Sequence, residues 1–196
     1  MADRFIPVDV SQLVERARAG EPAAFRELFR LHLSRVHRIV HRMAGASSDV
    51  DDLVQTVFVE GFRSLPSFRG ESLFSTWLGR IAVRVSLRAK KRPALMLVPL
   101  DVAGDQPSQA QGPHEDASAR EGLRRLDALL AALRPKKRAA FVLHALEGYS
   151  IEETAAMVGA SVAAVKVRIH DARRELERRA LKDPYFSERV GAKEPR

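Results

Sequence analysis

The chain has 196 residues, 45% of them hydrophobic, and it contains no cysteine. The missing cysteines exclude disulfides and thiolate metal sites, and the length allows one domain or two small ones. The longest apolar run, Ala94 to Leu100, is far shorter than the roughly 20 residues that a membrane-spanning helix needs. The N-terminus lacks the basic-then-apolar pattern of a signal peptide. These features predict a soluble, cytoplasmic protein with no membrane insertion.

The charge is positive overall and unevenly distributed. There are 33 Lys and Arg against 25 Asp and Glu, a formal net charge of +8. Residues 1–92 and residues 119–196 are both basic, whereas residues 93–118 hold four acidic side chains and no Lys or Arg. Two basic blocks joined by an acidic connector predict two contacts with a polyanion. Solvated faces of arginine-rich helices are the alternative explanation.

The N-terminal block predicts helices. Residues 9–45 are expected to form two of them, with Pro22 in the first turn of the second, where proline is favoured. Ser48 or Asp49 is expected to cap a third helix, and Pro66 is expected to end it. Its first turn carries acidic residues, which the helix dipole favours at that end.

A fourth helix is expected over residues 75–91. Residues 93–118 contain four prolines together with Gly, Ser and Gln, which predicts an extended acidic linker. Helical patterns then resume, and residues 184–196 are expected to form a disordered tail. Because no segment has a strand pattern, the predicted fold class is all-α, with two small helical domains at residues 1–92 and 119–183.

The stretch "YSIEETAAMVGASVAAVKVRIHDARREL" has a helix–short turn–helix pattern. Ser150 and Glu153 form a predicted capping box at the start of the first helix. Gly159 permits the left-handed backbone of a tight turn at the end of that helix, and Ser161 is expected to cap the second helix. The inward sector of that helix comprises Val162, Val165, Ile169, Ala172 and Leu176. The outward sector comprises Ala163, Val167, His170, Asp171, Arg174 and Arg178, flanked by Lys166 and Arg173. This pattern predicts a helix-turn-helix that reads duplex DNA in the major groove.

Packing alone could also explain an αα-hairpin with a basic second helix. Val167 favours DNA binding, because an apolar side chain on the outermost face has no core to fill but could touch a thymine methyl group. Asp171 argues the other way, because phosphate repels a carboxylate unless it accepts a hydrogen bond from a cytosine amino group.

An aromatic cluster surrounds a Gly-Glu-Ser turn in the N-terminal block. Phe68, Phe74 and Trp77, the single tryptophan, lie around this turn, and a basic helix follows. Phe74 and Trp77 could pack on Phe58 and Phe62 as ordinary core residues. Alternatively, the loop and the basic helix could hold a separated DNA strand, because aromatic rings stack on unpaired bases and cations follow phosphates.

Two stretches together resemble a known family. "DVDDLVQTVFVEGFRSLPSFRGESLFSTWLGRIA" resembles region 2 of the extracytoplasmic-function sigma factors, and "LRPKKRAAFVLHALEGYSIEETAAMVGASVAAVKVRIHDARREL" resembles their region 4. The resemblance covers residues from about 9 to 92 and 119 to 180, in the family's order. It implies an alternative sigma factor, a non-catalytic subunit without a cofactor. Such a factor directs core RNA polymerase to −35 and −10 promoter elements and promotes DNA melting.

The resemblance also implies residue roles. Single-strand capture at the −10 element falls on Phe68, Arg69, Gly70, Glu71, Ser72, Phe74, Trp77, Arg80, Arg84 and Arg88. Duplex binding at the −35 element falls on Ser161, Ala163, Lys166, Val167, His170, Asp171, Arg173 and Arg174. Binding to the clamp helices of the largest polymerase subunit falls on Asp51, Asp52 and Gln55, although the two aspartates could merely complement the helix dipole. The other implied partners are the polymerase flap region and an anti-sigma factor.

Several residues depart from the family pattern. Arg84 stands where relatives commonly have Asn, and Arg88 where Asp or Asn is frequent. Thr56 replaces a usual acidic residue, and Val167 and Asp171 replace a frequent Ser and Arg on the recognition helix. These departures put the promoter sequence in doubt more than polymerase attachment.

The sequence contains features of two other kinds of function. His37 and His41 have an i, i+4 spacing that could share a metal ion, but no nearby carboxylate completes a site and the segment is crowded with cations. The serious alternative is an ordinary helix-turn-helix regulator that binds duplex DNA without polymerase. Such a regulator has no use for the aromatic loop.

Overall fold

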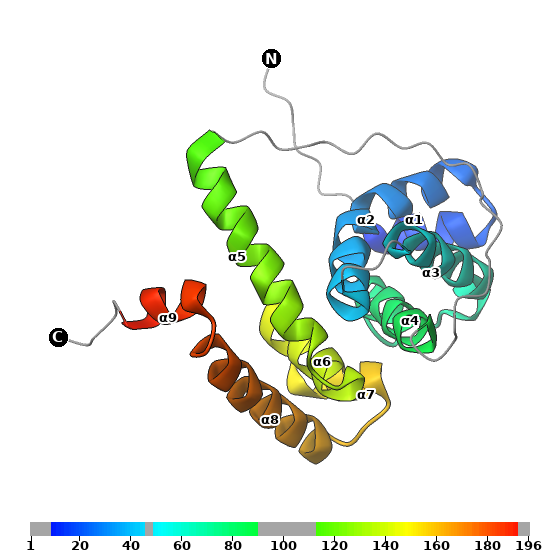
Figure 1. The fold of residues 1–196 in the computed structure, drawn as a ribbon. Coiled ribbons are helices and arrows are strands. Elements are labelled where there is room, and N and C mark those ends of the chain that lie inside the picture. Colours follow the sequence, from blue (N-terminus) through cyan, green and yellow to red (C-terminus); the bar gives the residue numbers. More distant parts are fainter. Residues whose placement is uncertain (1–8, 46–48, 90–112, 192–196) are drawn as a thin grey trace.

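The computed structural model describes residues 9–45, 49–89 and 113–191, and Figure 1 shows them as two groups of helices, α1–α4 and α5–α9. Within these ranges the secondary structure is helical, with no strand. The expected all-α fold with two helical domains is confirmed. The apolar segment Ala94 to Leu100 and most of the expected linker lie outside the described residues.

The first domain comprises α1 (Val10–Arg18), α2 (Pro22–Ala44), α3 (Val50–Ser64) and α4 (Phe74–Ala89), with a short 3₁₀ turn η1 (Leu65–Ser67) after α3. The long helix α2 packs against each of the other three. Pro22 occupies the first turn of α2 as expected, and Asp49 occupies the N-cap position of α3. Leu28, Val40 and Val57 are completely buried at the centre.

The second domain comprises α5 (Pro113–Ala131), α6 (Pro135–Phe141), a π-helical turn η2 (Val142–Leu146), α7 (Ile151–Val158), α8 (Val162–Ala180) and α9 (Pro184–Gly191). Its largest internal contact is between α6 and α8. Leu130, Val142 and Ala172 are buried between α5, α6 and α8.

Two boundaries differ from the sequence expectation. Helix α5 begins at Pro113, so the last part of the expected linker is helical. Residues 184–191, expected to be part of a disordered tail, form α9. Asp183 begins this helix by accepting a hydrogen bond from the Tyr185 backbone N–H at 2.9 Å, and Tyr185 Oη donates to the Ser118 carbonyl oxygen at 2.7 Å. The second contact joins positions 67 residues apart, so helical periodicity alone gives no sign of it.

The local signals of the helix-turn-helix are confirmed. Ser150 and Glu153 form both hydrogen bonds of a capping box, so both groups satisfy free backbone N–H groups at the start of α7. Gly159 adopts a left-handed backbone with φ 62°, a conformation that costs glycine little. The Ser161 hydroxyl accepts from the Ala164 N–H at 3.2 Å and caps α8. Together these caps fix the angle at which α8 leaves α7.

The two domains pack directly against each other. The hydrophobic core of the first domain continues into Leu143, Tyr149 and Met157 of the second. Arg138 on α6 is buried and donates from Nη1 to the Met43 carbonyl oxygen at the end of α2, at 2.9 Å. At Gly79 on α4, an added Cβ would lie 2.6 Å from the Met157 Cε atom, so α4 and the second domain approach closely because this position has no side chain.

Candidate nucleic-acid and polymerase interface

The turn between η1 and α4 presents polar groups to solvent. Arg69, Gly70 and Glu71 are exposed and Ser72 is half-buried. Gly70 has φ 73°, a backbone conformation that other residues rarely adopt, so the turn depends on glycine at this point. Leu73 follows and is 71% exposed. Sequence reasoning missed Leu73, although an apolar residue directly beside a polar turn was the available signal.

The aromatic cluster is mostly core. Phe68 and Phe74 are buried, and Trp77 is half-buried. The Trp77 ring centroid lies 5.1 Å from that of Phe68 and 5.4 Å from that of Phe74. In the turn region, Trp77 is therefore the one aromatic ring of the three that retains substantial exposure.

Phe74 and Trp77 share one core cluster with Phe58 and Phe62, as expected, but their ring contacts are with each other, Phe68 and His32. Phe58 and Phe62 form ring contacts with Phe29 and Phe25, respectively, on the neighbouring α2. Helix α3 turns these rings toward α2, so the cluster around the turn consists of Phe68, Phe74 and Trp77 with His32 on its inner side. Burial lowers the pKa of His32, with a further contribution from the neighbouring Arg35 cation.

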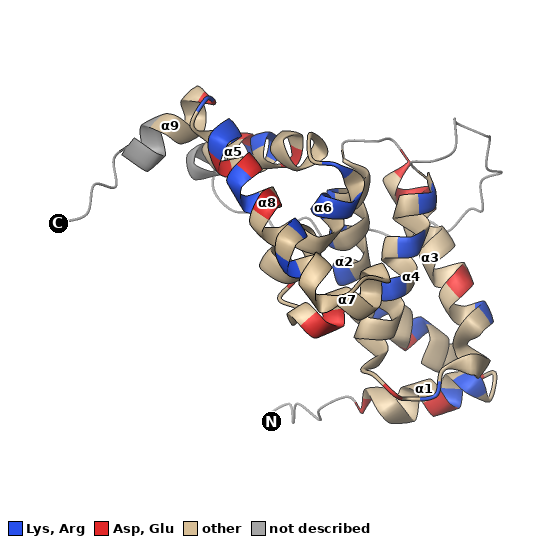
Figure 2. Ribbon diagram, turned by 90° about the horizontal axis from the view of Figure 1, so that it is seen from below, with Lys and Arg blue, Asp and Glu red and all other residues tan. Residues whose placement is uncertain are grey.

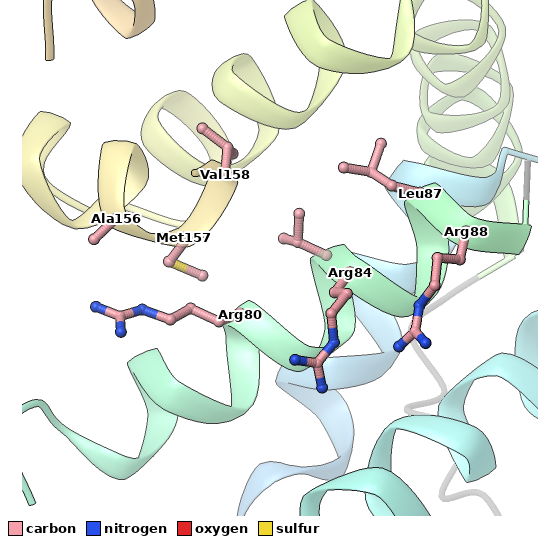
Figure 3. Close-up of a pocket in the computed structure, with 8 residues that line it drawn as sticks. Arg80, Arg84, Leu87, Arg88, Ala156, Met157 and Val158 are labelled. Carbon is pink, nitrogen blue, oxygen red and sulfur yellow. The ribbon is translucent and has the colours of Figure 1, made fainter. Parts of the chain in front are cut away.

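Three arginines, Arg80, Arg84 and Arg88, follow one another at successive turns of α4, and we call them the α4 arginine row. Figure 3 shows that Arg84 and Arg88 extend to one side of α4, whereas Arg80 extends toward Met157 of the second domain. The row borders a cleft of about 330 Å³ between α4 and α7, lined by the row itself together with Val83, Leu87, Ala156, Met157 and Val158.

The members of the row differ in their ionic contacts, because Arg84 and Arg88 pair with Glu60 and Arg80 does not. Arg84 Nη2 lies 3.1 Å from Glu60 Oε2 on α3, and Arg88 Nη2 lies 2.8 Å from the same atom. Both guanidinium groups are exposed. Arg80 is half-buried, and its Nε atom is buried without a hydrogen-bond partner.

The expected polymerase-binding residues lie near the start of α3. Asp51 and Asp52 are exposed in the first turn, and Gln55 is half-buried. Asp51 Oδ1 lies 3.6 Å from His37 Nε2 on α2. Thr56, the departure at this segment, donates its hydroxyl to the Asp52 carbonyl oxygen at 2.8 Å. This end of α3 therefore offers carboxylates to solvent, while the opposite face of the helix is in the core.

The outward face of α8 is available to a partner. Val167 is 60% exposed. The other exposed members of the predicted duplex-binding set are Ser161, Ala163, Lys166, His170, Arg173 and Arg174. Lys and Arg positions, coloured blue in Figure 2, also occur along α4 and α6. Val165, Ile169, Ala172 and Leu176 are buried as expected.

Two residues of α8 differ from the expected division. Val162, expected in the inward sector, is exposed at the start of the helix, because the first turn projects beyond the core formed by α6 and α7. Asp171 is half-buried and pairs with Lys137 on α6, with Oδ2 and Nζ 3.4 Å apart. This ion pair gives the carboxylate a role in packing α8 on α6.

His37 and His41 on α2 stack with ring centroids 6.2 Å apart. Each faces a different carboxylate: His37 faces Asp51, and His41 Nδ1 lies 3.8 Å from Asp127 Oδ2 on α5. Among the residues that the structure describes, no cluster of three or more His, Cys, Asp or Glu side chains is arranged to hold a metal ion.

An ionic cluster around a buried carboxylate joins the domains. The Glu147 side chain is 1% exposed, and its carboxylate accepts from Arg38 Nη2 at 3.3 Å and from Arg42 Nη1 at 2.6 Å. Arg35 Nη2 donates to the Glu147 carbonyl oxygen at 3.1 Å. We call these four residues the interdomain ionic cluster. Sequence reasoning missed it, because the contacts join positions more than one hundred residues apart.

Tyr149 extends this contact. Arg35 lies over its ring at 4.6 Å from the centroid, and the hydroxyl donates to the Ser75 carbonyl oxygen at 3.4 Å. Burial raises the pKa of the Tyr149 phenol, and the Arg35 cation lowers it by a smaller amount. Thr76 donates to Glu153 Oε1 nearby, at 3.3 Å. The start of α4, beside the polar turn, is therefore in contact with the helix-turn-helix.

Comparison with known proteins agrees with this architecture. The family model of sigma-70 region 2 matches residues 28–94, and that of sigma-70 region 4 matches residues 123–176. The first match contains the polar turn and the α4 arginine row, and the second contains the helix-turn-helix. Among the described residues, no helix combines the length and apolar character that crossing a membrane requires.

Several curated proteins are similar over most of the chain. The ECF RNA polymerase sigma factor SigM of Mycobacterium tuberculosis is 35% identical over 164 residues, which cover 82% of this chain and 79% of that protein. The ECF RNA polymerase sigma-E factor of Escherichia coli is 34% identical over 176 residues, with coverage of 84% and 91%. For SigE of Mycolicibacterium smegmatis the identity is 35% over 166 residues, with coverage of 80% and 63%.

Among solved structures, CnrH in complex with the cytosolic domain of CnrY matches with a TM-score of 0.68 at 28% identity. The match covers 89% of this chain and 99% of CnrH. The order of the helices, the paired regions and the identity over most of the SigM and sigma-E chains lead to one conclusion. The chain belongs to the ECF sigma factors of RNA polymerase.

Proposed function

We propose that this chain is an alternative sigma subunit that binds core RNA polymerase, directs it to promoters through −35 and −10 elements, and promotes strand separation. The observation that carries the proposal is the presence, in one chain, of an outward-facing recognition helix α8 and a polar turn beside an arginine-bearing α4. A regulator that binds only duplex DNA needs the first feature but not the second.

The second domain would bind the intact duplex at the −35 element. Small side chains at the start of α8 permit close approach to base edges, and Val167 can contact a thymine methyl group. Lys166, Arg173 and Arg174 would bind phosphates beside the groove, which adds affinity without adding sequence preference. Because Asp171 is held by Lys137, we infer that it positions α8 rather than reading a base.

The first domain would hold a separated strand at the −10 element. The turn from Arg69 to Ser72 offers backbone and side-chain polar groups to an unstacked base, and Trp77 offers a partly exposed ring. Stacking on an aromatic ring contributes about 1–3 kcal/mol per base, which is comparable to the few kcal/mol that unstacking a base costs. The buried Phe68 and Phe74 would support the turn from beneath.

Promoter binding would require the domains to separate. The two elements lie about 25 base pairs apart, which corresponds to roughly 85 Å of duplex. In this structure, by contrast, Tyr149 and Met157 of the second domain contact α4 of the first. The chain between Ala89 and Pro113 can reach roughly 80 Å when fully extended. This reach is slightly less than the span, and the domains themselves supply the remainder, because α2 alone, with 23 residues, is roughly 35 Å long.

Asp51, Asp52 and Gln55 would bind the clamp helices of the largest polymerase subunit, since they lie on the exposed start of α3. An anti-sigma factor is the proposed regulator, and the cytoplasm is the proposed location. The support for the regulator comes from similar proteins: CnrH was solved with the cytosolic domain of CnrY, and RpoE of Bartonella quintana was solved with the anti-sigma factor NepR.

The proposal is tested by run-off transcription with purified core polymerase, the chain and a library of promoter sequences. We expect transcripts from a restricted set of templates that share two elements, and none without the chain. Duplex binding without any association with core polymerase would instead identify an ordinary helix-turn-helix regulator.

A further inference from the structure

Glu60 lies between the two outer members of the α4 arginine row. Its Oε1 and Oε2 atoms are 2.9 Å and 2.8 Å from Arg88 Nη2, and Oε2 is 3.1 Å from Arg84 Nη2. The carboxylate comes from α3 and the guanidinium groups from α4, so the contact is set by packing of the two helices. The two arginines are one turn apart on α4, and a single carboxylate binds both.

This pairing affects two of the three cations that face the proposed −10 strand. Arg80 has no carboxylate partner among the residues that the structure describes, and it extends toward Met157 of the second domain (Figure 3). The structure therefore associates both outer cations of the row with a neighbouring anion.

We propose that Glu60 is a specificity-determining residue: its carboxylate occupies Arg84 and Arg88 and weakens their sequence-independent attraction for DNA phosphates. This inference rests on the proposed function and deepens it. A phosphate that approaches either arginine must compete with Glu60 for the same N–H donors. The contact is exposed to water, so a strand that is also held by the polar turn can displace the carboxylate. A strand without that second contact is bound poorly.

Competition with phosphate and a purely structural role for Glu60 predict different effects of removing its carboxylate. If Glu60 only braced α3 against α4, its removal would lower the melting temperature and leave DNA selectivity unchanged. If Glu60 competes with phosphate, its removal raises affinity for any single strand. The number of counterions released on binding then also increases, which makes the salt dependence of binding steeper.

The test compares the full-length Glu60→Gln chain with a matched control. Glu27→Gln removes the same charge from a carboxylate of similar exposure, 31% against 28% for Glu60, that pairs with Arg30 on α2. Fluorescence anisotropy would measure binding of each chain to a mixed-sequence single strand of about 12 nucleotides and to a strand carrying the −10 element selected by run-off transcription. Each measurement would be repeated over a range of salt concentrations.

We expect Glu60→Gln to bind the mixed-sequence strand about 3- to 10-fold more tightly, with a salt slope about one unit steeper. Preference for the selected strand should shrink correspondingly, while Glu27→Gln stays within about twofold of the parent. Equal behaviour of the two variants would overturn the proposal.

A variant without the two arginines and a measurement of polymerase binding complete the test. In an Arg84→Gln/Arg88→Gln background, Glu60→Gln should no longer change binding, because coupled residues show non-additive effects. An undiminished effect in that background would contradict direct competition. Failure of the parent chain to bind core polymerase would overturn the proposed function, whereas the comparison on the mixed-sequence strand would still decide the role of Glu60.

Discussion

The interdomain ionic cluster gives a quantitative prediction about domain separation. Glu147→Gln keeps the shape of the side chain but removes the charge that binds Arg38 and Arg42. The Arg35 contact uses the backbone carbonyl of Glu147 and survives the substitution. We expect the variant to shift the chain from the packed arrangement toward separated domains, because the attraction to two guanidinium groups is lost.

The magnitude follows from the exposure of the three side chains. Breaking a fully buried pair costs about 3–5 kcal/mol, whereas exposed pairs contribute about 0–1 kcal/mol. Glu147 is 1% exposed, but Arg42 is 23% and Arg38 51% exposed, so water can solvate the arginines that remain. We therefore expect a loss of about 1–3 kcal/mol in domain docking, equivalent to a 5- to 150-fold change in the ratio of packed to separated molecules.

The absence of cysteine makes the assay direct, because two introduced cysteines are the sole labelling sites. Dyes at Arg63→Cys on α3 and Glu177→Cys on α8, both exposed positions, would report the distance between domains by single-molecule energy transfer. Glu147→Gln should increase the low-transfer population, and Glu152→Gln, an exposed change on α7, should not. Identical transfer distributions for the two variants would refute the reasoning.

Three further predictions concern single side chains. Ser150→Ala removes the capping box of α7 and should destabilise the second domain by about 1 kcal/mol, measured by thermal unfolding followed by circular dichroism. Because the pKa of Tyr149 is raised above 10.0, the unfolded chain loses this proton first. The protonated Tyr149 phenol should therefore make its full contribution to the free energy of unfolding below about pH 10. This contribution should fall as the pH rises through the folded pKa, and Tyr149→Phe should remove that part of the loss of stability at alkaline pH. Val167→Ala should leave the melting temperature unchanged but reduce preference at one thymine of the −35 element about threefold, measured by binding to a set of single-base duplex variants.

Local signals predicted most of the helices and the caps of the helix-turn-helix. Ser150, Glu153, Gly159 and Ser161 act through hydrogen bonds and dihedral angles within a few residues, so sequence spacing is sufficient to identify them. The buried stripe of α8 follows from helical periodicity in the same way. Val162 is exposed although periodicity places it on the inward face of α8. Periodicity gives the direction in which a side chain points, but not how far the core of the neighbouring helices extends.

Features that depend on tertiary contacts could not be read from the sequence. Phe68 was expected at the DNA surface but is buried, because its exposure depends on how the turn folds back on α4. Glu147 and Glu60 acquire their importance from arginines on other helices, and nothing in their local sequence marks them. Helix α9 is stable in the structure through Tyr185 and Asp183, which contact α5. For Glu147, Glu60 and α9 the decisive partner lies on another helix, distant along the chain.

The central claim, that this chain opens promoter DNA as part of polymerase, is tested most directly by permanganate footprinting of a selected promoter in the presence of core enzyme. We predict reactive thymines around the start site with the parent chain. With the Arg69→Ala/Ser72→Ala variant we predict loss of that reactivity, although the variant still binds core polymerase. Unchanged reactivity in the variant would contradict the role of the polar turn, and no reactivity with the parent chain would contradict the account as a whole.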